Sequence, residues 1–271
     1  MEQYTAVSYQ LSQQLTDAYS TSFGWSIRLI PKASRRDVYA LYGLVRVADE
    51  IVDSYRGPDA AKQLDDFEQQ TYDSIDSGYS ANPIIQAFAA TARHYAIPKE
   101  LITAFFHSMR LDLTKTRHTQ KSYTDYIYGS AEVVGLMMLR LFVSDAEYKR
   151  LEPAARHLGA AYQKVNFLRD IAADHAMGRW YFPNGDFTTF DDTQKAAIEA
   201  DIAADLTAGE KGIRELPESL RGAVSLSAVY YRALLEKIEQ QTAVTLKSSR
   251  IRIPNTQKLW LLMHHHVKGR R

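Results

Sequence analysis

Apolar residues recur every three or four positions along almost the whole chain, which is the spacing of amphipathic helices. Prolines and glycines are few and fall mostly between the periodic segments, where helix boundaries are expected. No segment alternates apolar and polar residues with hairpin turn chemistry, and the longest non-helical stretch is 178–192. We predict helices at 4–28, 33–55, 60–77, 84–95, 99–115, 122–143, 146–175, 193–213, 217–246 and 256–267.

This pattern predicts an all-α fold. No linker is rich enough in Pro, Gly or Ser to divide the chain, and no internal repeat stands out. We therefore expect residues 1–271 to form one all-α domain, a single-domain helical bundle packed by ridges into grooves around a central cavity.

Two of the predicted helices carry a polar stripe inside an otherwise apolar surface. The members of each stripe follow one another at steps of three or four residues, which places them on one helix face. Taken alone, the first stripe also fits a solvated face with an Arg46–Asp49 or Arg46–Glu50 ion pair, but two such stripes would be an unusual coincidence. The stripes are Tyr42, Arg46, Asp49 and Asp53 in the first helix and Gln163, Asn166, Asp170 and Asp174 in the second.

Each stripe contains two aspartates four residues apart, so their Cβ atoms lie about 5–6 Å from each other. Two carboxylates at this spacing repel, and burial in a bundle also removes their water. A cation relieves both penalties, and Mg²⁺ prefers one or two carboxylates together with phosphate oxygens. Arginines beside both stripes, Arg46 and Arg169, can bind phosphate oxygens in a bidentate manner. The sequence therefore predicts two walls that hold metal ions and a diphosphate between them.

Composition narrows the classes of function. The formal net charge is +1, with 33 basic and 32 acidic residues, so no global field favours nucleic acid. The absence of cysteine excludes disulfides, zinc–thiolate sites, iron–sulfur clusters and cysteine nucleophiles. No Glu has a His three residues later, which excludes the di-iron carboxylate motif. The first 14 residues are polar, and the most apolar stretch, 133–143, is too short to span a bilayer. We expect a cytoplasmic protein.

Beyond the stripes, further motifs carry a resemblance. The chain resembles the squalene/phytoene synthase family of head-to-head prenyl transferases over nearly its whole length, and most of all a bacterial phytoene synthase. The order of the two aspartate motifs between a Ser-Phe start and a Gly-Arg-x-Tyr-x-Pro segment is specific. The matching segments are 19–23, 36–42, 46–53, 128–135, 163–174 and 178–183.

The resemblance implies an isoprenoid synthase-like fold and assigns roles to residues. It implies Mg²⁺, with Mn²⁺ as an alternative, bound by Asp49, Asp53, Asn166, Asp170 and Asp174. Its catalytic set is Asp49, Asp53, Asp170, Asp174, Tyr42 and Arg46. Its substrate-binding set is Tyr19, Ser20, Thr21, Ser22, Phe23, Tyr42, Arg46, Gln163, Arg169, Tyr231 and Arg252. Two alternatives stay open, Tyr230 in place of Tyr231 and Arg250 in place of Arg252.

The implied reaction joins two prenyl diphosphates. The first expectation is condensation of two geranylgeranyl diphosphates to phytoene through a cyclopropylcarbinyl diphosphate, in carotenoid biosynthesis and without NAD(P)H. The alternative uses farnesyl diphosphate to make dehydrosqualene or squalene, and a remote alternative is a non-catalytic bundle for assembly or binding. No general base for the final proton loss stands out in the sequence. Further expected partners are downstream carotenoid enzymes and, for product release, a membrane surface; nucleic acid is not expected.

Several features depart from the family pattern or stand outside it. Glu50 replaces an aspartate that is common in the first motif, and Glu132 replaces a small residue and is expected to alter the local cavity wall. The run 264–266 is three histidines, which we assign to the surface of a final helix. The basic tail 267–271 fits either a solvated end or contact with anionic lipid.

Overall fold

The computed structural model of the chain describes residues 1–271 except 56, 255, 258–260 and 262–271, and of residues 21 and 22 it describes the backbone alone. It confirms the all-α prediction, since the described residues contain helices and no strand. The elements are α1 (Glu2–Tyr19), α2 (Thr21–Arg28), α3 (Lys32–Asp49), η1 (Glu50–Tyr55), α4 (Ala60–Ser77), α5 (Pro83–His94), α6 (Lys99–Thr114), α7 (Gln120–Ile127), η2 (Tyr128–Glu132), α8 (Val133–Arg140), α9 (Asp145–Ala176), α10 (Asp192–Ile213), α11 (Glu218–Glu239) and α12 (Ala243–Ser248).

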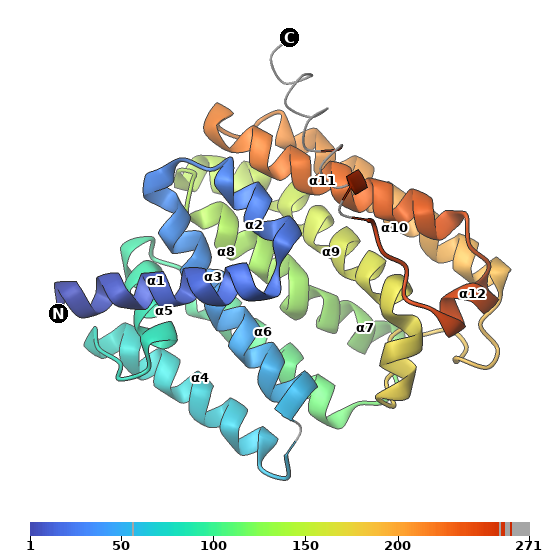
Figure 1. Cartoon of the computed structure of the whole chain (residues 1–271), viewed down its shortest axis with the longest axis horizontal. Helices are drawn as coiled ribbons and strands as arrows, with labels where there is room; N and C mark the ends of the chain where they lie inside the picture. Colours follow the sequence, from blue (N-terminus) through green and yellow to red (C-terminus); the bar gives the residue numbers. More distant parts are fainter. Residues whose placement is uncertain (56, 255, 258–260, 262–271) are drawn as a thin grey trace.

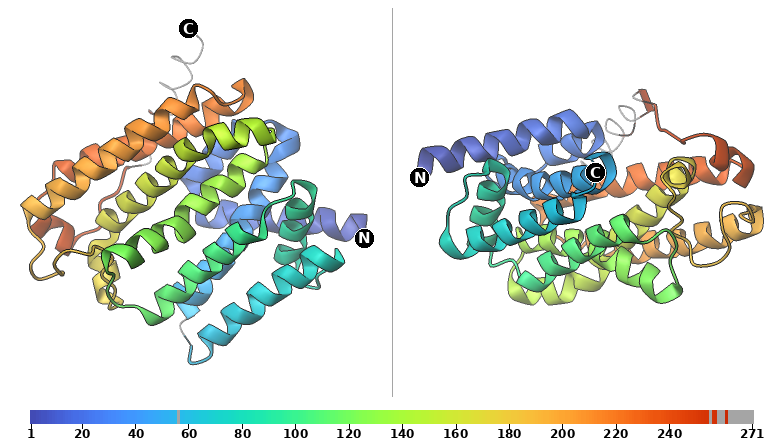
Figure 2. Two further views of the ribbon diagram at one scale, coloured as in Figure 1. Left: turned by 180° about the vertical axis from the view of Figure 1, so that it is seen from behind. Right: turned by 90° about the horizontal axis from the view of Figure 1, so that it is seen from below.

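The long helix α9 runs through the middle of the bundle (Figure 1). It packs against α8 and η2 on one side and against α10 and α11 on the other, and these helices run side by side in both views of Figure 2. The helix α3 packs against α1, α5, α6 and α8 in the other half of the molecule. The two helices that carry the polar stripes are therefore central elements of neighbouring halves.

Apolar residues beside each stripe anchor its helix in the core. Leu41 and Leu44 of α3 are completely buried with Phe105 and Phe106 of α6. A second cluster surrounds Leu168 of α9. Burial of each such side chain contributes about 1.5–3 kcal/mol. This packing fixes the rotation of α3 and α9, and with it the direction in which their polar stripes face.

The predicted continuous helix 4–28 is wrong at Ser20. Its backbone is extended (φ −141°, ψ 102°), and its hydroxyl accepts a hydrogen bond from Phe23 N at 3.3 Å, which caps the start of α2. The chain thus turns within residues 19–23, the first of the segments that match the family. Serine is a preferred cap residue, so the break had a local signal that the apolar periodicity concealed.

Other boundaries also differ from the prediction. The segments 33–55 and 122–143 are not uniform α-helices, because η1 and η2 are π-helical turns, which occur frequently at functional sites. The predicted helix 217–246 ends at Glu239, and Thr242 caps a separate α12. Most of the predicted helix 256–267, the histidine run 264–266 and the basic tail 267–271 lie outside the described residues. None of the described helices has the length and hydrophobicity to cross a bilayer.

The contact between η2 and α6 depends on Gly129. A Cβ at this position would overlap the carbonyl oxygen of Ala104 and the hydroxyl of Ser108, both on α6. The Ser108 hydroxyl donates to the carbonyl oxygen of Tyr126 at 3.2 Å, so it is fixed in place. We expect Gly129→Ala to lower the free energy of unfolding by about 2 kcal/mol or more, since overpacking forces the backbone to shift.

Urea denaturation measured by circular dichroism tests this expectation. The matched control is Gly222→Ala in α11, where an added Cβ meets nothing within 4 Å. Gly222→Ala should be neutral or stabilising by up to about 1 kcal/mol, since alanine favours helix. Equal midpoints for the two variants would contradict the close-packing explanation.

Candidate functional site

The two acidic stripes face each other and are joined by Arg179. Asp49 ends α3 and Asp53 lies in η1, whereas Asp174 lies near the end of α9. The guanidinium of Arg179 donates to Asp53 Oδ1 at 2.6 Å, and its backbone N–H donates to the carbonyl oxygen of Asp174 at 2.9 Å. Gly178 adopts φ +77°, a conformation that glycine adopts without strain, and so turns the chain back toward α9.

The pKa values of the stripe carboxylates report on the same proximity. Burial, and then the like charge of Asp53, raise the pKa of Asp49 to about 8, although Arg46 opposes the shift. Burial and Asp170 raise the pKa of Asp174 to about 7, and the charge of Asp53 on the opposite wall adds to this effect. The two stripes therefore share one electrostatic environment, as the sequence predicted.

Sequence reasoning missed a fifth carboxylate, Asp112 of α6. Its buried Oδ2 accepts a hydrogen bond from Tyr126 at 2.6 Å, and its Oδ1 accepts one from Tyr181 at 2.8 Å. Burial raises the pKa of Asp112 to about 6, against the opposing charge of Arg179 and both hydrogen bonds. Arg179 and Tyr181 belong to the segment 178–183 that the family resemblance includes, but no sequence pattern marks Asp112.

Arginines lie at both walls. Arg46 forms an ion pair with Glu50, one of the two pairs considered from the sequence, and its guanidinium lies 4.4 Å from the ring centroid of Tyr19. On the other wall, Arg169 NH2 lies 2.6 Å from Asp170 Oδ2. The site thus contains guanidinium groups next to each aspartate motif, and both are already paired with carboxylates.

The structure distinguishes the two C-terminal arginines. Arg250 Nε lies 2.6 Å from Asp170 Oδ1. Arg252 is exposed, and its carbonyl oxygen accepts a hydrogen bond from Lys237 Nζ at 2.7 Å. Arg250 is therefore at the second acidic stripe, whereas a binding role for Arg252 stays a prediction.

Aromatic and polar side chains gather beside the stripes. The rings of Phe23 and Tyr42 stack with centroids 5.2 Å apart, and Ser20 hydrogen-bonds Tyr42. Burial raises the pKa of Tyr42 above its usual range. On the facing side, Tyr231 stacks on Tyr162 at 3.9 Å. The predicted roles of the Thr21 and Ser22 side chains lie outside the described part of the chain.

A mainly apolar cavity of about 460 Å³ opens from this polar region. Ser20, Tyr42, Gln163, Asn166 and Tyr231 line its polar part. Its apolar walls come from α2, α3, α8, α9, α10 and α11, and include Ile27, Leu41, Met138, Phe142, Leu151, Leu158, Ile213 and Leu216. The lining of α9 reaches from residue 151 to residue 166, which corresponds to about 22 Å of helix. The cavity combines a polar end, lined by the uncharged stripe members Tyr42, Gln163 and Asn166, with a long hydrocarbon-like interior; no stripe aspartate lines it. We call the region of the two stripes beside this polar end the mouth. The cavity includes Tyr231 but not Tyr230, which lines a smaller neighbouring pocket together with Tyr231.

The residues of the mouth fit a hard divalent cation. All predicted ligands offer oxygen, which is the donor that Mg²⁺ prefers. Asn166 hydrogen-bonds Tyr231, and its Oδ1 is buried without a hydrogen-bond partner among the described residues. Over those residues, no three His, Cys, Asp or Glu side chains converge closely enough to hold an ion. A pair of carboxylates on each wall is still compatible with Mg²⁺, which binds through one or two carboxylates and takes further ligands from phosphate.

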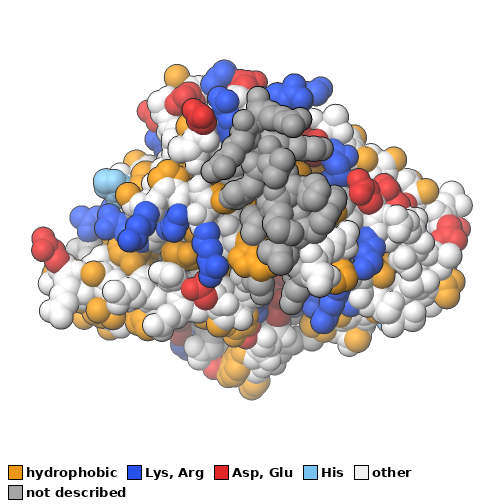
Figure 3. Space-filling view, turned by 45° about the horizontal axis from the view of Figure 1, so that its top comes forward, with side chains coloured by type: hydrophobic (Ala, Val, Ile, Leu, Met, Phe, Trp, Pro, Cys, Tyr) orange, Lys and Arg blue, Asp and Glu red, His pale blue; other side chains and the backbone are white. Residues whose placement is uncertain are grey.

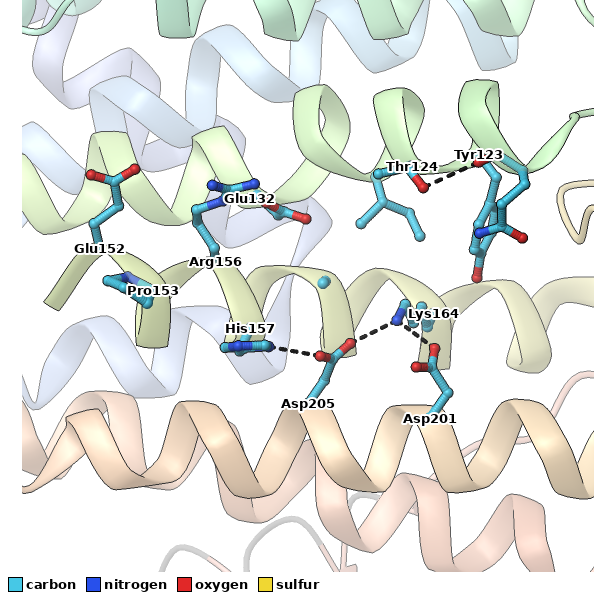
Figure 4. Close-up of a pocket in the computed structure, with 13 residues that line it drawn as sticks. Tyr123, Thr124, Glu132, Glu152, Pro153, Arg156, His157, Lys164, Asp201 and Asp205 are labelled. Carbon is cyan, nitrogen blue, oxygen red and sulfur yellow. Dashed lines mark hydrogen bonds and ion pairs between the residues drawn. The ribbon is translucent and has the colours of Figure 1, made fainter.

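A second pocket of about 400 Å³ lies between α7, α9 and α10 (Figure 4). None of the stripe aspartates lines it. Asp205 contacts His157 Nδ1 at 2.8 Å and Lys164 Nζ at 2.7 Å there, and Arg156 pairs with Glu132. Glu132 lines this pocket, whereas the preceding Ser130 and Ala131 line the apolar cavity, so an effect of Glu132 on the local cavity wall stays a prediction.

Comparisons with known proteins agree with this architecture. A family profile described as "Squalene/phytoene synthase" matches residues 16–257. The chain is 28% identical to phytoene synthase of Arthrospira platensis, over 97% of this chain and 94% of that protein. It is 29% identical to 15-cis-phytoene synthase of Synechococcus elongatus (93% and 90%) and 26% identical to 4,4'-diapophytoene synthase of Staphylococcus haemolyticus (73% and 70%).

Solved structures share the fold. The crystal structure of a dehydrosqualene synthase in complex with ligand superposes with a TM-score of 0.84 and 23% sequence identity, covering 99% of this chain and 98% of that one. Squalene synthase HpnC from Alicyclobacillus acidocaldarius gives a TM-score of 0.76 at 21% identity, covering 88% and 95%. The arrangement of helices around the cavity is thus an isoprenoid synthase-like fold.

The raised pKa values predict how stability depends on pH in the absence of metal. Asp49 and Asp174, with pKa values of about 8 and 7, hold protons in the folded state that the unfolded chain releases near pH 4. Between these limits the unfolded state binds fewer protons, so stability falls as pH rises. In EDTA, we expect the melting temperature to drop between pH 6 and pH 8, by about 2–4 °C for each kcal/mol.

Differential scanning calorimetry measures this dependence. Asp49→Asn removes one titrating carboxyl and should flatten the decline, whereas Asp65→Asn on the surface of α4 should leave it unchanged. A melting temperature that rises from pH 6 to pH 8 would refute the assignment of protonated carboxyls to the mouth.

Proposed function

Because the chain belongs to the squalene/phytoene synthase family of prenyl transferases, we propose that it condenses two prenyl diphosphates head to head. One observation carries the proposal: the two stripes whose aspartates approach each other around Arg179 also supply Tyr42, Gln163 and Asn166 to the polar end of an apolar cavity. A prenyl diphosphate has the same division, with a highly charged end and a hydrocarbon chain. The diphosphate belongs at the stripes and the chain in the cavity.

The mouth residues have distinct roles in this proposal. Asp49, Asp53, Asn166, Asp170 and Asp174 hold Mg²⁺, with Mn²⁺ as an alternative. When bound, the metal supplies the positive charge that makes diphosphate a good leaving group. Arg46 and Arg169 donate hydrogen bonds to phosphate oxygens, which a planar guanidinium does in bidentate geometry.

Loss of the first diphosphate breaks a carbon–oxygen bond and leaves an allylic cation in the cavity. The faces of Tyr42, Phe23 and Tyr231 stabilise this cation, and the apolar walls exclude the water that would trap it. The cation attacks the 2,3 double bond of the second molecule and gives a cyclopropylcarbinyl diphosphate. A second ionisation and rearrangement give the 1–1′ linked product, and in the phytoene-type outcome one proton leaves. Released diphosphate is the acceptor we favour for that proton, because no described carboxylate or histidine lies among the residues that line the cavity.

Geranylgeranyl diphosphate is the donor that we propose, with phytoene as product and no requirement for NAD(P)H. Support comes from phytoene synthases among the relatives with the widest coverage. A farnesyl diphosphate-using activity is the second candidate, since a 4,4'-diapophytoene synthase has similar identity. Carotenoid-modifying enzymes are the proposed consumers of the product.

The product is a hydrocarbon, so we also propose that it leaves at a membrane surface to which the protein binds peripherally. Basic and acidic side chains are interspersed on the face in Figure 3, and several Lys and Arg side chains form a row along one side. Such rows are attracted to anionic lipid by about 1 kcal/mol per charge near the surface.

Product analysis tests the reaction and the donor. Purified protein with Mg²⁺ and geranylgeranyl diphosphate should form phytoene, identified by mass spectrometry, at a higher kcat/KM than any product from farnesyl diphosphate. When anionic lipid vesicles are added to the same assay and then sedimented, both the product and the protein should be found in the vesicle pellet. Absence of a hydrocarbon product from both donors would eliminate the proposed function.

Substitution of the stripe aspartates tests the metal assignment. Asp49→Ala and Asp170→Ala should each lower kcat by about 10²-fold or more, a loss typical of removing charge stabilisation of the transition state. Circular dichroism should show unchanged helicity. Asp65→Ala, which removes an exposed partner of Arg110, is the control and should retain full turnover. Wild-type turnover in either stripe variant would contradict the assigned role.

A further inference from the structure

Arg179 occupies a position that the proposed metal chemistry leaves unexplained. Its side chain is only 5% exposed and lies between η1, α6 and the end of α9. One terminal nitrogen donates to Asp53 Oδ1 at 2.6 Å. The other donates to the carbonyl oxygens of Val52 at 3.0 Å and Asp112 at 3.2 Å. A buried guanidinium thus takes hold of a carboxylate to which the family resemblance assigns a metal.

The third nitrogen of this guanidinium is not satisfied. Arg179 Nε is buried without a hydrogen-bond partner among the described residues, and it lies 3.9 Å from Asp112 Oδ1. An N–H···O bond needs about 2.7–3.2 Å, so a shift of roughly 1 Å would complete it. The carboxylate of Asp112 is fixed by Tyr126 and Tyr181 and cannot easily approach.

We propose that Arg179 is the resident counter-ion of Asp53, and that Asp112 is the positioning residue toward which its guanidinium moves when Asp53 binds a divalent cation. This inference rests on the proposed function, because it presupposes metal at the first stripe. The nitrogen that bonds both carbonyl oxygens acts as the pivot. When the guanidinium rotates about this nitrogen, its other terminal nitrogen leaves Asp53 and its Nε approaches the carboxylate of Asp112.

The charges require such an exchange. A guanidinium and a divalent ion on the same carboxylate repel each other, although Asp53 is 42% exposed and water weakens this repulsion. A guanidinium that simply lost Asp53 would remain buried and unpaired, which is costly. Asp112 removes that cost, since it offers a second carboxylate 3.9 Å away in the starting position. Asp112 therefore acts on metal binding through Arg179 and not by direct contact.

Binding of Mn²⁺ to the full-length protein without prenyl substrates tests the exchange, with the free ion followed by electron paramagnetic resonance. Arg179→Gln removes the competing charge and should tighten Mn²⁺ binding by about 5-fold, and Arg179→Lys, which keeps the charge, should not. Asp112→Asn should weaken binding by about 5-fold when Arg179 is present and by less than about 2-fold in the Arg179→Gln background. Arg110→Gln, on the same helix as Asp112, is the matched control and should bind as wild type does.

Each other outcome decides against the proposal. Weaker binding in Arg179→Gln would make Arg179 a clamp for the two walls and not a counter-ion. An equal effect of Asp112→Asn with and without Arg179 would mean a general electrostatic contribution. If Asp112→Asn does not fold, as judged by circular dichroism, the two Arg179 variants still decide the counter-ion role. Unchanged Mn²⁺ binding in all variants, with hydrocarbon product still formed, would overturn this inference while the proposed function stands.

Discussion

Repulsion between carboxylates that are held close together and partly removed from water is the constraint around which this fold is arranged. Asp49 and Asp53 on one wall, and Asp170 and Asp174 on the other, are brought together on two stripes whose uncharged members line the polar end of an apolar cavity. No chain would hold them there without strong compensation. The compensation is the rigid packing of α3 and α9, whose apolar flanks are completely buried and cannot rotate the stripes toward solvent.

Local irregularities of the helices serve the same arrangement. The π-helical turn η1 carries Asp53, so the end of the first stripe departs from regular α-helical phase. The positive φ of Gly178 returns Arg179 to the site, and the capped break at Ser20 starts α2 beside Tyr42. Each irregularity directs a polar group to the mouth, whereas the regular helices build the core. Functional demands thus explain where the chain departs from ideal helix geometry.

The sequence alone was enough to predict the features that repeat. Helical periodicity identified the bundle, and the repeated steps of three and four identified both stripes and their common orientation. The sequence alone was not enough where a feature of the site depends on a single residue. Asp112 is one acidic residue in an amphipathic helix, and only the fold brings it to Arg179. Arg250 and Arg252 stand two residues apart in a segment without regular secondary structure, where no periodic pattern tells them apart, and only the fold shows that Arg250 contacts Asp170. The breaks at Ser20 and at the π-helical turns interrupt helices whose apolar pattern continues without change.

The pairing of charges at the mouth bears on the order in which substrate and metal would bind under the proposed function. Six carboxylates lie there, those of Asp49, Glu50, Asp53, Asp112, Asp170 and Asp174. Four guanidinium groups lie among them, those of Arg46, Arg169, Arg179 and Arg250. All four arginines already contact carboxylates of this group, so none is a free anion site. A diphosphate that arrived alone would have to compete with these carboxylates for every guanidinium. Divalent cations held by the stripe aspartates would supply positive charge at those carboxylates, and Arg46 and Arg169 would then be able to turn toward the phosphate oxygens. Under the proposed function, the pairing of every arginine would make diphosphate binding depend on the metal, so the allylic cation would form only in the complete complex.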